Sequence, residues 1–193
     1  MLSAKFHFEK ANLYFAANEF YNAVLEYDKA IKIKPHYIIA HINKGNAYFK
    51  LKNYEQALTS YAVAIKLAPN NPQPYYNSAI IYRYLDNYSE AILNYSKVIE
   101  IEPNYADAYI NRGNIKLKIG LNEDAINDYS YALSIDANYI EACYNRGLAY
   151  KNLGDDEKAL EDFKRVIDLK EQKSEVAIFK RSKNKSKFFS KII

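Results

Sequence analysis

Tryptophan is absent from the 193-residue sequence, cysteine occurs once, and glycine and proline occur five times each. The lone Cys143 cannot form an internal disulfide, and there is no CxxC motif or Cys/His cluster of the kind that holds zinc. β-Sandwiches and α/β enzymes normally use more glycine in their turns, so this composition disfavours both classes. No run of about 18 apolar residues occurs, and the sequence therefore predicts no membrane-spanning helix.

Motifs that bind nucleotides or metals, or that carry a nucleophile, are missing as well. The sequence contains no GxxxxGK[ST], GxGxxG, HExxH or GxSxG. His7 and His41 occupy a repeated column that elsewhere holds tyrosine or cysteine, which favours packing over metal binding, and His36 lies in a linker. We therefore predict a protein that is not an enzyme and that carries neither a cofactor nor a metal.

The two ends of the chain differ in charge. Lys5, Glu9 and Lys10 interrupt any apolar stretch at the N-terminus, so no secretory signal is predicted and a cytoplasmic location is expected. The net charge of +4 comes from the C-terminal tail, and the rest of the chain is close to neutral. The basic residues that cluster there are Lys180, Arg181, Lys183, Lys185 and Lys187.

An internal repeat of 34 residues organises the remainder. Hydrophobic residues make up 49% of the chain, and their spacing of three and four residues predicts two helices in each repeat. Two columns hold only small residues, which lets paired helices approach closely, and a third holds tyrosine or phenylalanine. The small residues are Ala11, Gly45, Ala79, Gly113 and Gly147 in one column and Ala23, Ala57, Ala91, Ala125 and Ala159 in the other. The aromatic column consists of Tyr27, Tyr61, Tyr95, Tyr129 and Phe163.

Local signals agree with this division. Asn71 followed by Pro72 is typical of a helix start, and Gly120 and Gly154 lie where a tight turn should join the two helices of a repeat. The prolines Pro35, Pro69 and Pro103 are 34 residues apart and should end the second helices. A single hairpin cannot bury both of its faces, so the repeats are expected to stack into one continuous core.

The period and these columns resemble the tetratricopeptide repeat (TPR) family. The resemblance covers residues 4–173 and implies an all-α, right-handed α-solenoid of five helical hairpins, followed by a capping helix and basic tail at 174–193. The five repeats run over residues 4–37, 38–71, 72–105, 106–139 and 140–173, and positions are counted below from the first residue of each. Ala137 and Glu171 depart from the family pattern, since they stand where the first three repeats have proline.

The first helices carry asparagines at positions 6 and 9. In TPR arrays these positions line a concave groove, so the resemblance implies a scaffold that binds a peptide or segment of a partner protein. A carboxamide can pair with both the N–H and the C=O of a peptide main chain. The predicted groove residues are Asn12, Asn43, Asn46, Asn77, Asn111, Asn114 and Asn145.

The sequence also allows two other interpretations of this asparagine ladder. Duplication copies a column whether or not it is used, so the ladder could be a solvated face or could bridge adjacent repeats. An apolar stripe at position 5 runs beside it and either lines the groove or packs against neighbouring helices. That stripe consists of Phe8, Ile42, Tyr76, Ile110 and Tyr144.

Two more specific kinds of binding can be weighed. The two-carboxylate clamp of TPR co-chaperones needs cations at positions where this chain, counted from the first repeat, has Phe8, Gln73 and Asn77. We therefore predict no chaperone clamp. The basic tail offers an alternative function, an adaptor that also docks on an anionic membrane surface or nucleic acid, although a solvated tail is the expectation and nucleic acid is not a predicted partner.

Overall fold

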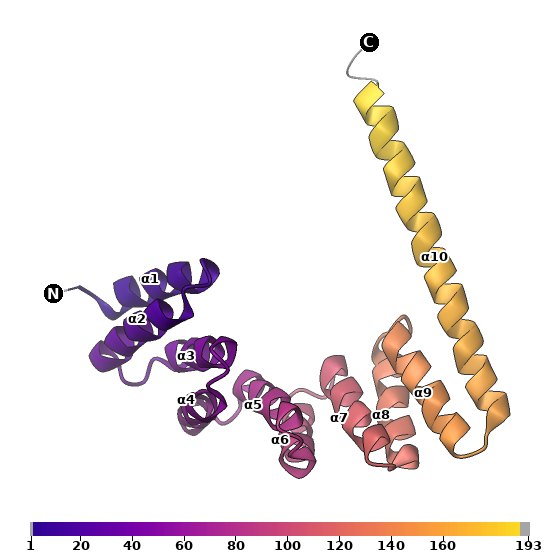
Figure 1. Cartoon of the computed structure of the whole chain (residues 1–193), viewed down its shortest axis with the longest axis horizontal. Helices are drawn as coiled ribbons and strands as arrows, with labels where there is room; N and C mark the ends of the chain where they lie inside the picture. The colour runs from indigo at the N-terminus through magenta and orange to yellow at the C-terminus, as the bar shows by residue number, and fades with distance from the viewer. Residues whose placement is uncertain (1, 190–193) are drawn as a thin grey trace. The chain divides into compact units, whose positions relative to one another are not determined.

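The computed structural model describes the backbone of residues 2–189 and the side chains of residues 2–172. The described residues form ten α-helices and no strand, so the predicted all-α array of TPR hairpins is confirmed. The helices are α1 (Ala4–Ala16), α2 (Phe20–Ile33), α3 (Ile38–Lys50), α4 (Tyr54–Leu67), α5 (Pro72–Tyr84), α6 (Tyr88–Ile101), α7 (Ala106–Lys118), α8 (Asn122–Ile135), α9 (Ile140–Asn152) and α10 (Asp156–Phe189) (Figure 1).

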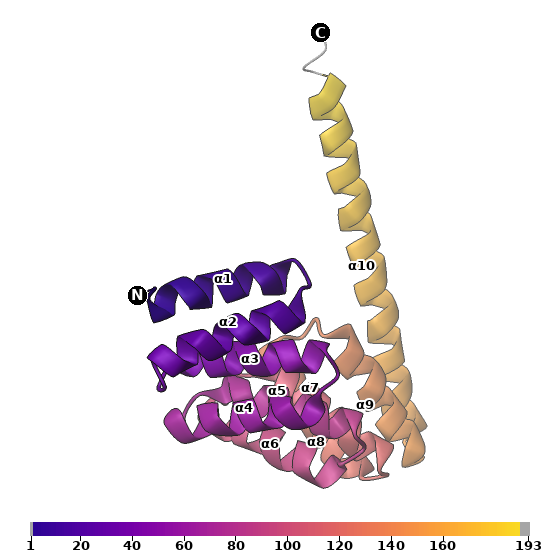
Figure 2. The same cartoon turned by 60° about the vertical axis from the view of Figure 1, so that its left-hand side comes forward.

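The chain divides into two compact units. The first, residues 1–108, contains the hairpins α1–α2, α3–α4 and α5–α6, and the second, residues 109–193, contains most of α7 and all of α8–α10. Within the first unit, α1 and α2 lie side by side and antiparallel (Figure 2).

Asparagine side chains and tight turns set the helix ends. Asn53, Asn71 and Asn87 each accept a hydrogen bond from a backbone N–H in the first turn of α4, α5 and α6, which satisfies one of the unpaired donors there. The turn inside every hairpin contains one residue with a positive φ, at position 15. It is glycine in the last two repeats but a residue with a Cβ in the first three. These residues are Asn18 (φ 60°), Lys52 (59°), Asp86 (56°), Gly120 (82°) and Gly154 (78°).

The core is a stack of tyrosine rings against the small residues. Tyr27, Tyr61, Tyr95 and Tyr129 are at most 1% exposed. In repeats 2 and 4 the ring lies against the position-8 glycine of its own hairpin: a Cβ added to Gly113 would lie 2.8 Å from Cε1 of Tyr129. The close approach predicted from the two small columns therefore exists, and the aromatic ring is what occupies the space that a larger residue would need.

The capping segment is helical, but it is not a separate helix. The repeat pattern predicts that α10 ends near residue 173 and that a further helix begins there, whereas α10 continues to Phe189 without a break (Figure 1). Glu171 stands where proline ends the corresponding helices of the first three repeats, and the segment that follows contains no proline or glycine. Nothing in the sequence therefore stops the helix.

Candidate functional site: the asparagine columns

Asparagines at positions 6 and 9 meet between consecutive repeats, together with the buried tyrosine at position 24. In the first junction, the Tyr27 hydroxyl donates to Oδ1 of Asn12 at 2.6 Å. Nδ2 of Asn43, in the next repeat, donates to the same oxygen at 3.2 Å. Asn12 thus links the two helices of its own hairpin to the first helix of the following one. We call this set of three side chains a Tyr–Asn–Asn junction.

Two further junctions repeat this geometry. Asn46 accepts from the Tyr61 hydroxyl at 2.7 Å and from Nδ2 of Asn77 at 2.9 Å. In the second unit, Asn114 accepts from Tyr129 and from Asn145, each at 2.8 Å. Six of the seven predicted groove residues are therefore brought together in pairs. The seventh, Asn111, is half-buried on α7.

Burial raises the pKa of the tyrosines in these junctions even further above neutral pH. It raises the pKa of Tyr27 to about 12, even though a hydrogen bond from Asn43 acts in the opposite direction. The pKa of Tyr61 and that of Tyr129 are raised further by the same cause. Each hydroxyl is therefore a hydrogen-bond donor at neutral pH, which fixes the position-9 amide with its oxygen toward the ring.

The junctions leave one polar atom unused in four of these six carboxamides. Among the described residues, Nδ2 of Asn12 and Nδ2 of Asn46 make no hydrogen bond, and neither does Oδ1 of Asn43 or Oδ1 of Asn145. Position 9 therefore offers N–H groups and position 6 offers oxygens. Two atoms are already used: Asn114 donates to Oε1 of Glu141 at 2.9 Å, and Oδ1 of Asn77 accepts from Gln73 at 2.8 Å.

Repeat 3 breaks the pattern. Its position 9 is Ile80, yet its position 24 is still tyrosine, so Tyr95 lacks the position-9 asparagine to which the other three tyrosines donate. The Tyr95 ring is fully buried, and within the described part of the chain its hydroxyl is the one buried side-chain polar atom without a hydrogen bond. Repeat 5 also has no asparagine at position 9, where Leu148 stands, but its position 24 is Phe163, which has no hydroxyl that needs an acceptor.

Most side chains of the apolar stripe at position 5 pack inside the array. Ile42 and Ile110 are only 2% and 4% exposed. The Phe8 ring lies 4.9 Å from that of Tyr37, centroid to centroid. Tyr144 is the exception, with 48% of its surface exposed. Of the two readings of the stripe, packing against neighbouring helices therefore holds for most of it.

A small pocket opens beside the second junction. Its volume is about 60 Å³. It combines polar atoms of the junction with two apolar side chains, and its lining consists of Asn46, Phe49, Tyr61, Asn77 and Ile80. Ile80 stands at position 9, where an asparagine would accept from Tyr95. In this pocket it forms part of an apolar wall next to the unused N–H of Asn46.

Comparison with known families agrees with this architecture. Models described as TPR repeat match residues 11–52, 45–82, 80–120 and 114–154, and a model described as tetratricopeptide repeat matches residues 140–173. The chain belongs to the TPR family. Proteins of this family generally act as scaffolds for protein–protein interaction, and no catalytic family is indicated.

Solved structures of other TPR proteins show the same fold. The crystal structure of MamA protein has a TM-score of 0.82 at 24% identity and covers 89% of this chain and 94% of its own. MamA 41-end from Desulfovibrio magneticus has a TM-score of 0.80 at 20% identity, covering 88% and 96%. YrrB, described as a TPR protein with an unusual peptide-binding site, has a TM-score of 0.72 at 24% identity and covers 84% of both chains. A search of curated protein sequences finds no significant match.

This TPR array also contains buried ion pairs that were not predicted from the sequence. They join positions 7 and 23 of one hairpin. Arg112 donates to Asp128 through Nε at 3.0 Å and Nη2 at 2.6 Å, and Arg146 donates to Asp162 at 2.8 and 2.7 Å. The signal was available as a basic residue 16 positions before an acidic one in repeats 1, 4 and 5. Repeats 2 and 3 instead have the uncharged residues Ser60 and Asn94 at position 23.

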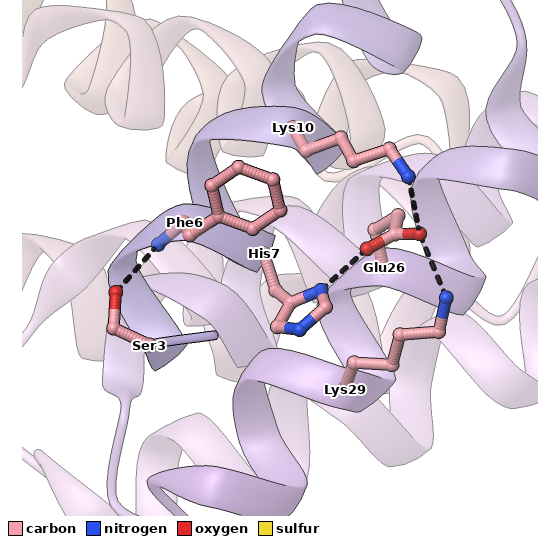
Figure 3. Close-up of polar contacts among 6 residues, drawn as sticks. All are labelled: Ser3, Phe6, His7, Lys10, Glu26 and Lys29. Carbon is pink, nitrogen blue, oxygen red and sulfur yellow. Dashed lines mark hydrogen bonds and ion pairs between the residues drawn. The ribbon is translucent and has the colours of Figure 1, made fainter. Parts of the chain in front are cut away.

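In repeat 1 the corresponding carboxylate is Glu26, which is 4% exposed. Figure 3 shows it between His7, Lys10 and Lys29. Glu26 accepts from His7 at 2.6 Å, from Lys10 at 3.0 Å and from Lys29 at 2.8 Å. Burial raises the pKa of Glu26, but these hydrogen bonds outweigh burial and lower it to about 2. His7 thus makes a hydrogen bond in the interior of the hairpin, as the packing interpretation of its column expects.

The other candidates for chemistry lie apart from the asparagine columns. Cys143 is fully buried, and burial raises the pKa of its thiol, so it does not present a thiolate. Within residues 2–172 no group of three metal-ligating side chains comes together. None of the described helices is long and apolar enough to cross a membrane. The side chains of the basic tail, including Lys180 and Arg181, lie outside the described residues.

Proposed function

We propose that this TPR array binds an extended segment of a partner protein in a groove lined by α1, α3 and α5, the first helices of its first unit, and that the asparagine ladder contacts the peptide main chain. The observation that carries this proposal is the pocket of about 60 Å³ beside Asn46, Phe49 and Ile80. It places an unused amide donor next to an apolar wall. An extended peptide presents the complementary combination, a main-chain carbonyl that can accept from the amide beside a side chain that can cover the apolar wall.

The hydrogen bonds of the junctions fix the orientation of the asparagine amides before a peptide binds. Because Tyr61 and Asn77 both donate to Oδ1 of Asn46, the Asn46 amide is held with Nδ2 directed away from them. In Asn43 the engaged atom is Nδ2, which donates to Asn12, so that Oδ1 is left available to accept a hydrogen bond. Since an extended main chain alternates N–H and C=O, fixed donors and acceptors on neighbouring helices suit it, and fixing them in advance lowers the entropy lost on binding.

The expected affinity is modest and depends on the apolar wall. A hydrogen bond of this kind contributes about 0.5–1.5 kcal/mol net, so a few main-chain contacts alone do not hold a peptide tightly. Phe49 and Ile80 are half-buried, and a small aliphatic side chain of the partner could cover the surface that they still expose. The similarity to YrrB, described as a TPR protein with an unusual peptide-binding site, supports a peptide ligand for this fold.

The test uses the charge variant Asn46→Asp. Aspartate retains oxygen acceptors for Tyr61 and Asn77, so the junction survives, but it loses the amide donor that the groove presents. Peptides are first selected from a random display library on the wild-type protein, and their dissociation constants are then measured by fluorescence polarisation. Asn46→Asp should weaken binding by about tenfold and leave the melting temperature nearly unchanged.

The matched control is Asn127→Asp, an exposed asparagine on α8 that lies outside the ladder. It should leave binding unchanged. Peptides that bind Asn46→Asp as tightly as the wild type would contradict the proposed contact, and a library that yields no binder would contradict the function itself.

A further inference from the structure

A second, larger pocket lies elsewhere in the first unit. Its volume is about 350 Å³, within the range of about 300–1,000 Å³ that is typical of ligand pockets. It lies between the start of α5 and the middle of α6, and it shares no residue with the asparagine columns. The lining residues are Tyr75, Leu93, Asn94, Ser96, Lys97 and Glu100.

The second unit contains the equivalent place, and there the chain fills it. Position 4 is tyrosine in both repeats: Tyr75 in repeat 3 and Tyr109 in repeat 4. In repeat 4, position 26 is Tyr131, whose ring stacks on that of Tyr109 with centroids 4.3 Å apart and an interplanar angle of 22°. Repeat 3 has Lys97 at position 26, and the space above Tyr75 is open.

Lys97 does not take the place of the missing ring. Its Nζ pairs instead with Oε1 of Glu100 at 2.7 Å, one turn further along α6. Leu93, on the preceding turn, leaves 63% of its surface exposed. The pocket thus has the ring of Tyr75 and an exposed leucine as apolar surfaces, and a neutralised ion pair at its rim.

We propose that this pocket receives an aromatic side chain, tyrosine or phenylalanine, from a partner protein. The occupant is inferred from the chain itself, because Tyr131 shows which group stacks on the position-4 tyrosine when one is present. A nucleotide suits the site less well, since Lys97 is already paired and the carboxylate of Glu100 repels phosphate. The pocket is larger than one ring needs, which leaves room for adjoining main-chain atoms.

The test titrates N-acetyl-L-tyrosinamide into the ¹⁵N-labelled full chain and follows amide shifts by NMR. Weak binding is expected, with a dissociation constant of roughly 1–10 mM. The shifts should centre on Tyr75, Leu93 and Lys97. Lys97→Tyr supplies the ring from within, as repeat 4 does, and should weaken probe binding at least about tenfold. Lys97→Ala leaves the pocket open and should still bind.

Three outcomes would overturn the proposal. The first is an absence of shifts at these residues in the wild type. The second is undiminished binding to Lys97→Tyr, whose fold is checked from the dispersion of the same spectra. The third is tighter binding of adenosine monophosphate than of the tyrosine probe, which would indicate a nucleotide site. None of these outcomes bears on the asparagine ladder, because Asn46→Asp and Lys97→Tyr alter separate surfaces.

Discussion

Repeats 2 and 3 follow each other in the chain and share the same helical hairpin, yet they treat their buried tyrosine differently. In repeat 2 the Tyr61 hydroxyl donates to Asn46, which also binds Asn77 of the next repeat. In repeat 3 Ile80 stands in the place of the asparagine, and the buried Tyr95 hydroxyl makes no hydrogen bond of normal geometry, although the Arg83 guanidinium lies near enough to act on its pKa. An unpaired buried hydroxyl costs about 1–3 kcal/mol. The difference shows that ring packing specifies this column and that the hydrogen bond is an addition to it.

The close packing behind this comparison should be the most sensitive feature. Repeat 2 has Gly45 where repeat 3 has Ala79, and a Cβ on Gly45 would overlap the Tyr61 ring. Gly45→Val should therefore lower the free energy of unfolding by about 3 kcal/mol, since overpacking displaces the ring from Asn46. Urea denaturation measures the loss. Ala62→Val, at an exposed position of α4, is the control and should cost little. Equal losses in the two variants would show that Tyr61 is loosely packed.

Electrostatics distinguishes repeat 1 from both of these repeats. Glu26 has a folded-state pKa of about 2, below its ordinary value of 4.5. Its ionised form therefore contributes stability that is complete above pH 4.5 and is lost as the pH falls toward 2. Glu26→Gln should cost about 2 kcal/mol at neutral pH, and the difference from the wild type should vanish near pH 2.

The control for this experiment is Ser60→Ala, at the same position of repeat 2. Ser60 carries no charge and donates to the carbonyl of Gln56 within its own helix. Its effect on the melting temperature should not change between pH 7 and pH 2. A pH-independent effect of Glu26→Gln would mean that the buried carboxylate contributes no charge-dependent stability.

The junction itself can be converted from one type to the other. Asn46→Ile gives repeat 2 the residue that repeat 3 has, and it leaves the Tyr61 hydroxyl without its acceptor. We expect a loss of about 1–2 kcal/mol in chemical denaturation. Asn46→Asp, which keeps an oxygen there, should lose much less. If the two variants were equally stable, the hydrogen bonds of the junction would contribute nothing measurable.

The smallest effect should come from removing the hydroxyls. Tyr61→Phe deletes a donor that is in use and should cost about 1 kcal/mol, whereas Tyr95→Phe deletes an unpaired one and should be neutral or slightly stabilising. Comparing the two melting temperatures tests the contrast directly. A loss in Tyr95→Phe as large as that in Tyr61→Phe would show that the Tyr95 hydroxyl has a partner after all.

Much of the fold could be predicted because it depends on local spacing. A period of 34 residues, two small columns and one aromatic column indicate paired helices whatever their surroundings. Turn chemistry was predicted only in part. Gly120 and Gly154 indicated their turns, but Asn18, Lys52 and Asp86 adopt the same positive φ without glycine to signal it. The prediction that α10 ends near residue 173 was wrong, because Glu171 replaces the helix-ending proline and the 34-residue period alone does not end a helix.

The candidate site divides in the same way. The sequence by itself determined that asparagines recur on one face of the first helices, because a column at a fixed period must return to that face. Only the tertiary structure decided what those asparagines bind. Asn46 meets Tyr61 and Asn77, which are 15 and 31 residues away in the chain, and that meeting depends on how one hairpin packs on the next. Likewise, Tyr131 covers Tyr109 while Lys97 leaves Tyr75 uncovered, because side-chain reach and partners, rather than period, determine which space is filled.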